Sequence, residues 1–218
     1  MNASSSVSST AMMRRLRVIG VLDAAERLNA TPLELEPMHA ILYFTEALAP
    51  VWNLPILDGQ ILKRIRPYYP ALQADVDALV GRGVIAVSGV RYIRIDNHWT
   101  LDANYNLNRT FSDRILTAAK RFPLRAAELA FVQEVMYATS GLGTAGLAAA
   151  GELDATYSDP LVDVGGLIEV ERDRGDGYNR TAAAAFRFNQ LLGSESPIST
   201  AEMVNLYVRR LYSRMHVA

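Results

Sequence analysis

Cysteine is absent from the 218 residues of the sequence. This absence excludes disulfide bonds, thiolate metal sites and cysteine nucleophiles together, and it is typical of the reducing cytoplasm, where we expect the protein to be located. Excess charge is also lacking, because the formal net charge is −1. The protein therefore has no overall field that would attract it to nucleic acid or to an anionic membrane, and any such binding must depend on a local group of side chains.

Long apolar runs are missing as well. The run Val18–Leu22 follows a group of arginines and superficially resembles a signal peptide, but Asp23 and Glu26 end it too early. No stretch reaches the length of a membrane span. We therefore expect a soluble protein that has no membrane partner.

Residue patterns that carry catalysis are scarce. The histidines His39, His98 and His216 have neither a second histidine nor a close acidic pair at metal-ligand spacing. His39 lies in an apolar helical segment, which favours a hydrogen-bonded interior side chain over a catalytic one. No serine occurs in a G-x-S-x-G elbow, and there is no P-loop motif. The sequence therefore predicts a protein that is not an enzyme, with no catalytic or metal-binding residue and no cofactor.

Two patterns that resemble sites have simpler explanations. Gly141–Gly146 matches G-x-G-x-x-G, but a dinucleotide-binding fingerprint follows a β-strand, whereas Arg125–Tyr137 is patterned as a helix. A flexible loop between helices is therefore the favoured interpretation of Gly141–Gly151. Asp75 and Asp77 face different directions on a helix, so we expect solvated surface carboxylates rather than an acid-base pair.

The residues from Pro67 to Thr100 predict the second half of a winged helix-turn-helix. Pro70 suits the first position of a helix, and Gly83 ends this helix after a face of apolar residues, Leu72, Val76, Leu79 and Val80. Two β-branched strands joined by a tight turn then follow, at Val84–Val87, Ser88-Gly89 and Val90–Ile95. The order predicts a mainly α fold with a small β-hairpin.

This winged helix-turn-helix is predicted to occupy residues 13–104. Residues 1–12 are rich in serine and predict a disordered tail. Helices are predicted over residues 13–28, 36–50 and 54–65. The polar run of residues 102–108 predicts a linker or the exit of the wing.

A C-terminal helical region is predicted over residues 105–218. Its helices are expected to begin at a capping box at Thr110–Asp113, to span residues 123–139 and 179–192, and to begin at a second capping box at Ser199–Glu202. Short strands and irregular packing both remain open for residues 161–164 and 167–170, and a turn is predicted at residues 175–177.

The helix before the wing decides how such a module would bind. In a helix-turn-helix that reads DNA, this helix enters the major groove and offers Arg, Lys, Asn or Gln to base edges. Here Ala71–Val80 contains two aspartates, one glutamine and no basic residue, so it would present the wrong charge to phosphates. Arg82, Arg91 and Arg94 could contact a DNA backbone without reading sequence, or they could be ordinary solubilising side chains.

Protein binding is the remaining use of a winged helix. Trp52, Tyr68 and Tyr69 lie in proline-rich segments, and Trp and Tyr are typical anchors of protein interfaces. The same side chains could instead fill the core. Both interpretations remain open at this point.

Five segments of the sequence together resemble a known family. They are Ile19–Ala25, His39–Trp52, Pro67–Gln73, Leu79–Val84 and Leu206–Leu211. These segments resemble the small middle component of bacterial ABC-three component defence systems, the Lamassu-like group. The resemblance implies a non-enzymatic accessory subunit of an anti-phage assembly with an SMC-like ATPase and a separate effector, often a nuclease, in which the complex senses DNA. It assigns no role to an individual residue.

The sequence thus leads to one main hypothesis and two alternatives. The main hypothesis is an accessory subunit that bridges the ATPase and the effector through protein-protein contacts. The alternatives are a winged-helix DNA-binding regulator that uses Arg82, Arg91 and Arg94, and a small enzyme of unrecognised type.

Overall fold

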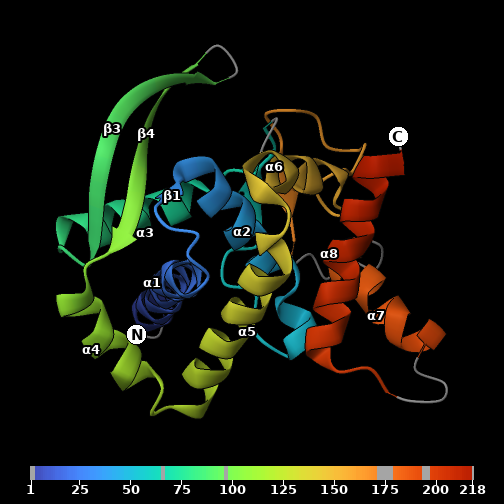
Figure 1. Cartoon of the computed structure of the whole chain (residues 1–218), viewed down its shortest axis with the longest axis horizontal. Coiled ribbons are helices and arrows are strands. Elements are labelled where there is room, and N and C mark those ends of the chain that lie inside the picture. The colour runs from blue at the N-terminus through green and yellow to red at the C-terminus, as the bar shows by residue number, and fades with distance from the viewer. Residues whose placement is uncertain (1–2, 65–66, 96–97, 171–178, 193–196, 218) are drawn as a thin grey trace.

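The computed structural model describes residues 3–64, 67–95, 98–170, 179–192 and 197–217. Helices make up most of the molecule, together with two small antiparallel sheets (Figure 1), and the prediction of a mainly α fold is confirmed. In chain order the elements are α1 (Ala3–Arg27), β1 (Leu33–Glu34), α2 (Leu35–Ala47), the 3-10 helix η1 (Ala49–Trp52), β2 (Gln60–Leu62), α3 (Pro70–Gly81), β3 (Ile85–Ile95), β4 (His98–Leu107), α4 (Arg109–Ala119), α5 (Pro123–Ser140), α6 (Gly143–Leu153), β5 (Leu167–Glu169), α7 (Arg180–Leu192) and α8 (Thr200–Val217).

The larger sheet has the strand order β1-β4-β3. Strands β3 and β4 pair from Ile85 opposite Leu107 to Ile95 opposite His98. The predicted turn at Ser88-Gly89 is therefore wrong, because Gly89 has a φ of +59° inside β3 and lies at a bulge between Ser88 and Arg91. A glycine in this conformation satisfies a bulge as well as it satisfies a turn.

Residues 102–107, part of the segment for which the sequence predicts a linker or the exit of the wing, belong to the second strand of the hairpin, β4. In residues 102–108, polar side chains alternate with Ala103, Tyr105 and Leu107, all of which are buried. Such alternation is the pattern of a strand with one face on the core. The prediction of a linker is therefore wrong, and the hairpin is longer than the sequence indicated.

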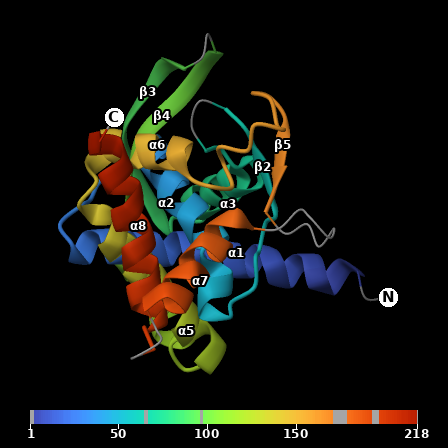
Figure 2. The same ribbon diagram turned by 90° about the vertical axis from the view of Figure 1, so that its right-hand side faces the viewer.

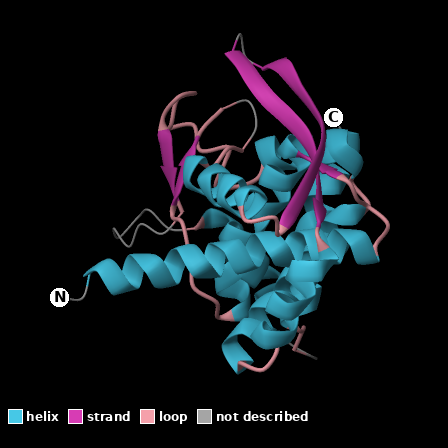
Figure 3. Ribbon diagram, turned by 90° about the vertical axis from the view of Figure 1, so that its left-hand side faces the viewer, coloured by secondary structure: helices cyan, strands magenta, loops and turns pink. Residues whose placement is uncertain are grey.

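Helix α1 begins at Ala3, so the predicted disordered tail is wrong over the part of residues 1–12 that the structure describes. Extending an existing helix costs far less free energy than starting a new one, so a serine-rich segment can continue it. Figures 2 and 3 show the N-terminal part of α1 extending away from the body. The later part, from Leu16 to Ala25, is buried.

The helix predicted over residues 54–65 does not form in the described part of that range, residues 54–64. Pro55 and the Asp58-Gly59 pair interrupt this segment, and Gln60–Leu62 instead pairs with Leu167–Glu169 as the two-stranded sheet β2-β5. The open alternative for residues 167–170 is thus resolved in favour of a strand. Residues 161–164 pack irregularly.

Helices α3, α5, α7 and α8 confirm their predictions within a few residues at each end. The capping box of α8 is formed, because Ser199 N donates to Glu202 Oε2 at 2.7 Å and Glu202 N donates to Ser199 Oγ at 3.2 Å. Helix α4 is capped by Asn108, whose Oδ1 accepts from Thr110 N at 3.2 Å, and not by Thr110 as predicted.

The glycine-rich segment after α5 was predicted as a flexible loop and is instead helix α6. Its alanines favour a helix despite the glycines, and the helix packs against α2 and α8. The G-x-G-x-x-G pattern therefore runs into a helix that follows another helix. The turn predicted at residues 175–177 lies outside the described residues.

One contiguous cluster of buried apolar side chains extends from Leu16 of α1 to Leu211 of α8, so residues of both predicted regions share a core. Helix α2 lies inside it, with every residue except Glu36 buried. Helices α1, α5 and α6 pack against α2, and α7 and α8 lie at the front in Figure 2. Among the described residues, none of the helices has the length and hydropathy needed to cross a membrane.

Candidate interaction surface

His39 is an interior side chain, as the sequence predicted. Tyr69 N donates to its Nδ1 at 3.3 Å, so Nε2 carries the proton that is donated to Gln73 Oε1 at 3.0 Å. Burial lowers the pKa of His39 to about 4, which keeps the ring neutral near pH 7. His216 is exposed, with Nδ1 2.8 Å from Tyr212 O. The side chain of His98 lies outside the described part of the structure.

A buried carboxylate at the end of α6 joins four helices. Asp154 accepts hydrogen bonds from the hydroxyl groups of Tyr43 on α2, Thr181 on α7 and Tyr207 on α8, the last two at 2.8 Å and 2.6 Å. Burial raises the pKa of Tyr43 and of Tyr207 far above the ordinary value, so both hydroxyls remain donors. This Asp154 cluster is fully buried, and its function is to hold these helices together.

A second buried cluster joins α1, α2 and α5. Arg17 donates from Nη1 to Glu46 Oε1 at 2.7 Å and from Nε to Glu128 Oε1. Glu46 also accepts from the backbone N–H of Leu57 at 2.8 Å, which anchors the loop after η1. We call Arg17, Glu46 and Glu128 the Arg17 cluster. Because all three are buried, they fix the packing of helices and do not form an accessible site.

Of the three aromatic residues predicted as partner anchors, one is buried and two are half-buried. Tyr69 is buried, and the half-buried Trp52 has its ring centroid 5.7 Å from that of Phe131. Tyr68 is half-buried, stacked on His39 with 4.8 Å between ring centroids. Filling of the core is thus the interpretation that the structure supports for Tyr69, and Trp52 packs against the core as well.

The arginines predicted to contact a DNA backbone do not form one cluster. Arg91 Nη2 lies 2.7 Å from Asp102 Oδ2 and 3.3 Å from Glu34 Oε1, and these carboxylates raise the pKa of its guanidinium. Arg82 and Arg94 are exposed. Arg91 pairs across the strands with Asp102 and therefore lies on the opposite face of the hairpin from Arg94, three residues further along the same strand. The three arginines therefore do not share one surface of the hairpin.

The charge of α3 is smaller than the sequence suggested. Asp75 is buried between Arg14 and Arg15, whose Nε atoms lie 2.7 Å from Oδ2 and Oδ1 respectively, so the prediction of a solvated carboxylate is wrong. Asp75 stands three residues after the buried Leu72, a spacing that places it on the core-facing side. This spacing was the signal that sequence reasoning missed. Asp77 is exposed and accepts from Gln73 Nε2 at 2.9 Å.

The exposed side of α3 is small and weakly acidic. It consists of residues spaced three or four apart, Pro70, Ala74, Asp77 and Gly81. Within this fully described helix, none of the residues is basic. The helix therefore offers no cationic or amide donor of the kind that reads base edges from its exposed face.

The hairpin exposes apolar side chains that sequence reasoning missed. Tyr92 lies opposite Leu101 and Arg94 lies opposite Trp99, so the side chains of these pairs share one face. We call its apolar members the hairpin face, with the exposed fractions Val90 59%, Tyr92 73%, Trp99 70% and Leu101 48%. The sequence pattern for this face is the alternation of large apolar residues with other residues on either side of Asp96-Asn97. The predicted turn at Ser88-Gly89 placed these residues in the wrong strands, so the face was not recognised.

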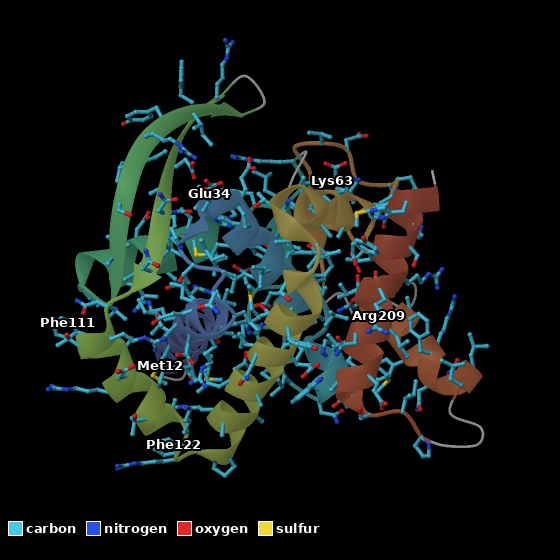
Figure 4. The ribbon with its side chains drawn as sticks, in the orientation of Figure 1. Met12, Glu34, Lys63, Phe111, Phe122 and Arg209 are labelled. Carbon is cyan, nitrogen blue, oxygen red and sulfur yellow. The ribbon has the colours of Figure 1, made fainter. Side chains whose placement is uncertain are left out.

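The hairpin stands clear of the helical body (Figures 1 and 3), and its strands extend well beyond the helices beneath them. Its inner part is fixed to the body by β1, since Leu33 pairs with Tyr105 and both are buried. Arg91 of the hairpin also forms an exposed ion pair with Glu34 of β1, and Glu34 is labelled in Figure 4. The hairpin face is therefore presented on a supported, projecting element.

In the described part of the chain, no group of three or more His, Asp or Glu side chains is placed to hold a metal ion. No model of a known protein family matches the sequence, and no curated protein is significantly similar to it. Chemically, the site can bury apolar and aromatic surface against a partner.

Proposed function

We propose that this chain is a non-enzymatic accessory subunit that acts by binding other proteins, with a winged-helix module as one docking element. The winged helix, in which the wing is the hairpin β3-β4, is supported by the order α1, β1, α2, α3, β3, β4, into which η1 and β2 are inserted between α2 and α3, and by the sheet order β1-β4-β3. Residues 54–64 form no helix, so three α-helices, α1, α2 and α3, precede the wing together with the short 3-10 helix η1, which agrees with this proposal.

One observation carries the proposal, namely the contrast between the wing and the exposed side of α3. The wing presents Tyr92 and Trp99, and such aromatic residues bury a large area at low entropic cost in protein interfaces. An exposed group of large apolar side chains on a projecting element is typical of an interaction site. The small side chains of α3, Ala74 and Gly81, would allow close approach of a partner backbone.

Direct reading of DNA is a weaker explanation of the same surface. The exposed charge of α3 comes from Asp77, and Arg91 of the wing is already paired with Asp102 and Glu34. A DNA-binding wing would then depend on Arg82 and Arg94, whose contribution would be to the phosphate backbone. We therefore place the regulator hypothesis second.

The partner class follows from the resemblance to the middle component of ABC-three component defence systems. On this proposal the chain bridges an SMC-like ATPase and an effector of an anti-phage system, and DNA is contacted through the complex. A bridging subunit needs exposed apolar surface and a rigid body behind it. The hairpin face and the single core of the molecule supply both.

The test is co-expression of the chain with the proteins encoded by the genes adjacent to its own. We expect an SMC-like ATPase to co-purify. The double variant Tyr92→Ala/Trp99→Ala should weaken binding by about 2 kcal/mol or more, which is roughly thirtyfold in Kd. Tyr137→Ala is the matched control, because Tyr137 is 61% exposed on α5, away from the hairpin, and its loss should leave Kd unchanged.

Two results would contradict the proposal. One is a chain that stays monomeric and binds none of the neighbouring gene products. The other is tight binding of duplex DNA whose salt dependence is reduced by Arg82→Ala and Arg94→Ala while Tyr92→Ala/Trp99→Ala has no effect. The second result would establish the DNA-binding regulator instead.

A further inference from the structure

A groove with an apolar floor runs between α1, α4 and the C-terminal end of α3. Its volume is about 370 Å³. Apolar side chains form most of its lining, namely Met12, Met13, Leu16, Ile19, Leu79, Val84, Ile115, Ala118 and Ala119. In Figure 4, Met12 of α1 lies on the same side of the molecule as Phe111 and Phe122 of the α4–α5 segment. The groove is distinct from the hairpin face, which lies at the other end of β3 and β4.

The charged side chains of the groove are all of one sign. Arg15, Arg82 and Arg125 line it, and none of the described lining residues carries a carboxylate. Arg15 forms an ion pair with Asp75. Arg82 is exposed, and the guanidinium of Arg125 lies 4.9 Å from the ring centroid of Phe122. Exposed basic residues follow nearby along the chain, at Arg114, Lys120 and Arg121. The groove thus has an apolar floor with positive charge beside it.

We infer that this groove binds an amphipathic helix of a partner protein, which places apolar side chains on the floor and carboxylates beside Arg82 and Arg125. The inference rests on the proposed function and names the kind of segment that the subunit recognises. Helices bound in grooves use apolar anchors at i, i+3, i+4 and i+7. Met12 and Met13 supply a floor that adapts to such anchors, since methionine is flexible and polarisable.

Other occupants fit the groove less well. Phosphates of a nucleic acid would pair with the arginines but would leave the apolar floor uncovered, which loses the free energy of burying it. A small anionic amphiphile would match the volume, which is within the range of roughly 300–1,000 Å³ that is typical of ligand pockets. It would not, however, explain the exposed basic residues that continue along α4 beyond the lining.

A groove and a hairpin face at separate places are what a bridging subunit needs. The two surfaces do not share a residue, so one partner can occupy each at the same time. Opposite charge at the groove would also accelerate encounter with an acidic segment and discriminate against a basic one. Selectivity for charge is therefore the property to measure.

The test uses the full-length protein and two designed peptides. Both carry leucine at i, i+3, i+4 and i+7, and the flanking positions are glutamate in one peptide and lysine in the other. Fluorescence anisotropy should show the glutamate peptide binding at least about tenfold more tightly. Arg82→Glu/Arg125→Glu should reverse this preference, whereas Arg209→Glu/Arg210→Glu, on exposed residues of α8, should leave it unchanged. Figure 4 labels Arg209 on the opposite side of the molecule.

A second variant tests the floor and not the charge. Ala118 is exposed and lines the groove, so Ala118→Trp should fill it without disturbing a buried side chain and should abolish binding of the glutamate peptide. The inference would be overturned if the two peptides bind equally, if neither binds, or if the glutamate peptide still binds to Ala118→Trp. Laurate or duplex DNA that binds in place of the peptide, with loss in the same variants, would overturn it as well.

Binding of the peptide and binding of the ATPase are measured separately, and the two results distinguish this inference from the proposed function. Tyr92→Ala/Trp99→Ala should leave peptide binding unchanged while weakening the ATPase complex. If the ATPase binds through the hairpin face but the glutamate peptide does not bind, the groove inference fails and the proposed function stands. If the peptide binds and the neighbouring gene products do not, the proposed function fails.

Discussion

The interior of the molecule and its hairpin distribute polar and apolar side chains in opposite ways. In the interior, Arg17 and Asp154 are fully buried with their partners, whereas on the hairpin Tyr92 and Trp99 are largely exposed. Charged residues are rarely buried unless they are paired, and large groups of apolar side chains are rarely left exposed. The two regions therefore use their unusual residues for different purposes.

The difference separates the residues that join elements of the fold from those that are exposed at the surface. The Arg17 cluster joins α1, α2 and α5, and the Asp154 cluster joins α2, α6, α7 and α8. The buried charged residues of these two clusters therefore join helices. The apolar side chains of the hairpin face are exposed instead, and on our proposal they contact a partner.

The largest effect on stability is expected from Arg17→Met. The substitution leaves Glu46 and Glu128 buried without their cation, and breaking a buried ion pair in this way costs about 3–5 kcal/mol. Urea unfolding followed by circular dichroism measures the loss. Arg27→Met is the matched control on the same helix, because Arg27 is half exposed and its pair with Asp23 contributes at most about 1 kcal/mol.

A second substitution distinguishes a charge effect from a packing effect at this cluster. Glu128→Gln added to Arg17→Met removes one uncompensated charge and should recover part of the lost free energy of unfolding. If the double variant is less stable than Arg17→Met alone, the ion pairs do not account for the effect of Arg17.

Asp154→Ala should have the next largest effect. It removes the common acceptor of Tyr43, Thr181 and Tyr207, whose buried hydroxyls then lose a hydrogen bond. Leaving such groups unsatisfied costs about 1–3 kcal/mol each, and we expect a total of about 3 kcal/mol in the free energy of unfolding. The exposed Asp163 provides the control Asp163→Ala, and equal losses in both variants would show that Asp154 does not organise the four helices.

The contrast between interior and hairpin also explains what the sequence could predict. The buried helices α2 and α5 were found from apolar residues that cover much of the helix surface, and the interior position of His39 followed from its apolar neighbours. These signals are local, since each depends on residues within a few turns of one another. Local patterns therefore predicted the helices of the core.

Pairings between distant segments were not predictable in the same way. Asp75 forms an ion pair with Arg14, which lies 61 positions away in the chain, and no local pattern in α3 predicts that partner. The prediction of the hairpin register was wrong for a different reason, because Ser88-Gly89 has the composition of a turn but forms a bulge. That single error hid the hairpin face, since a shifted register assigns side chains to other faces.

The pH dependence of stability provides a further comparison between interior and surface. The unfolded chain binds a proton on His39 near the ordinary pKa of 6.5, whereas the folded protein does not until about pH 4. Stability linked to His39 is therefore complete above pH 6.5 and is lost as the pH falls toward 4, by a total of about 3 kcal/mol. His39→Gln should make the free energy of unfolding less dependent on pH in this window, and equal slopes for the two proteins would contradict a neutral buried His39.

The smallest effect on stability is expected where the proposed effect on binding is largest. Tyr92→Ser and Trp99→Ser replace side chains that are 73% and 70% exposed, so each should change the free energy of unfolding by no more than about 0.5 kcal/mol. Urea unfolding of the isolated protein measures this, with Tyr105→Ser as the contrast, because Tyr105 is buried on the inner part of the same hairpin. A loss at Trp99 as large as that at Tyr105 would mean that the outer hairpin packs within the chain, and its side chains would then not be available to a partner.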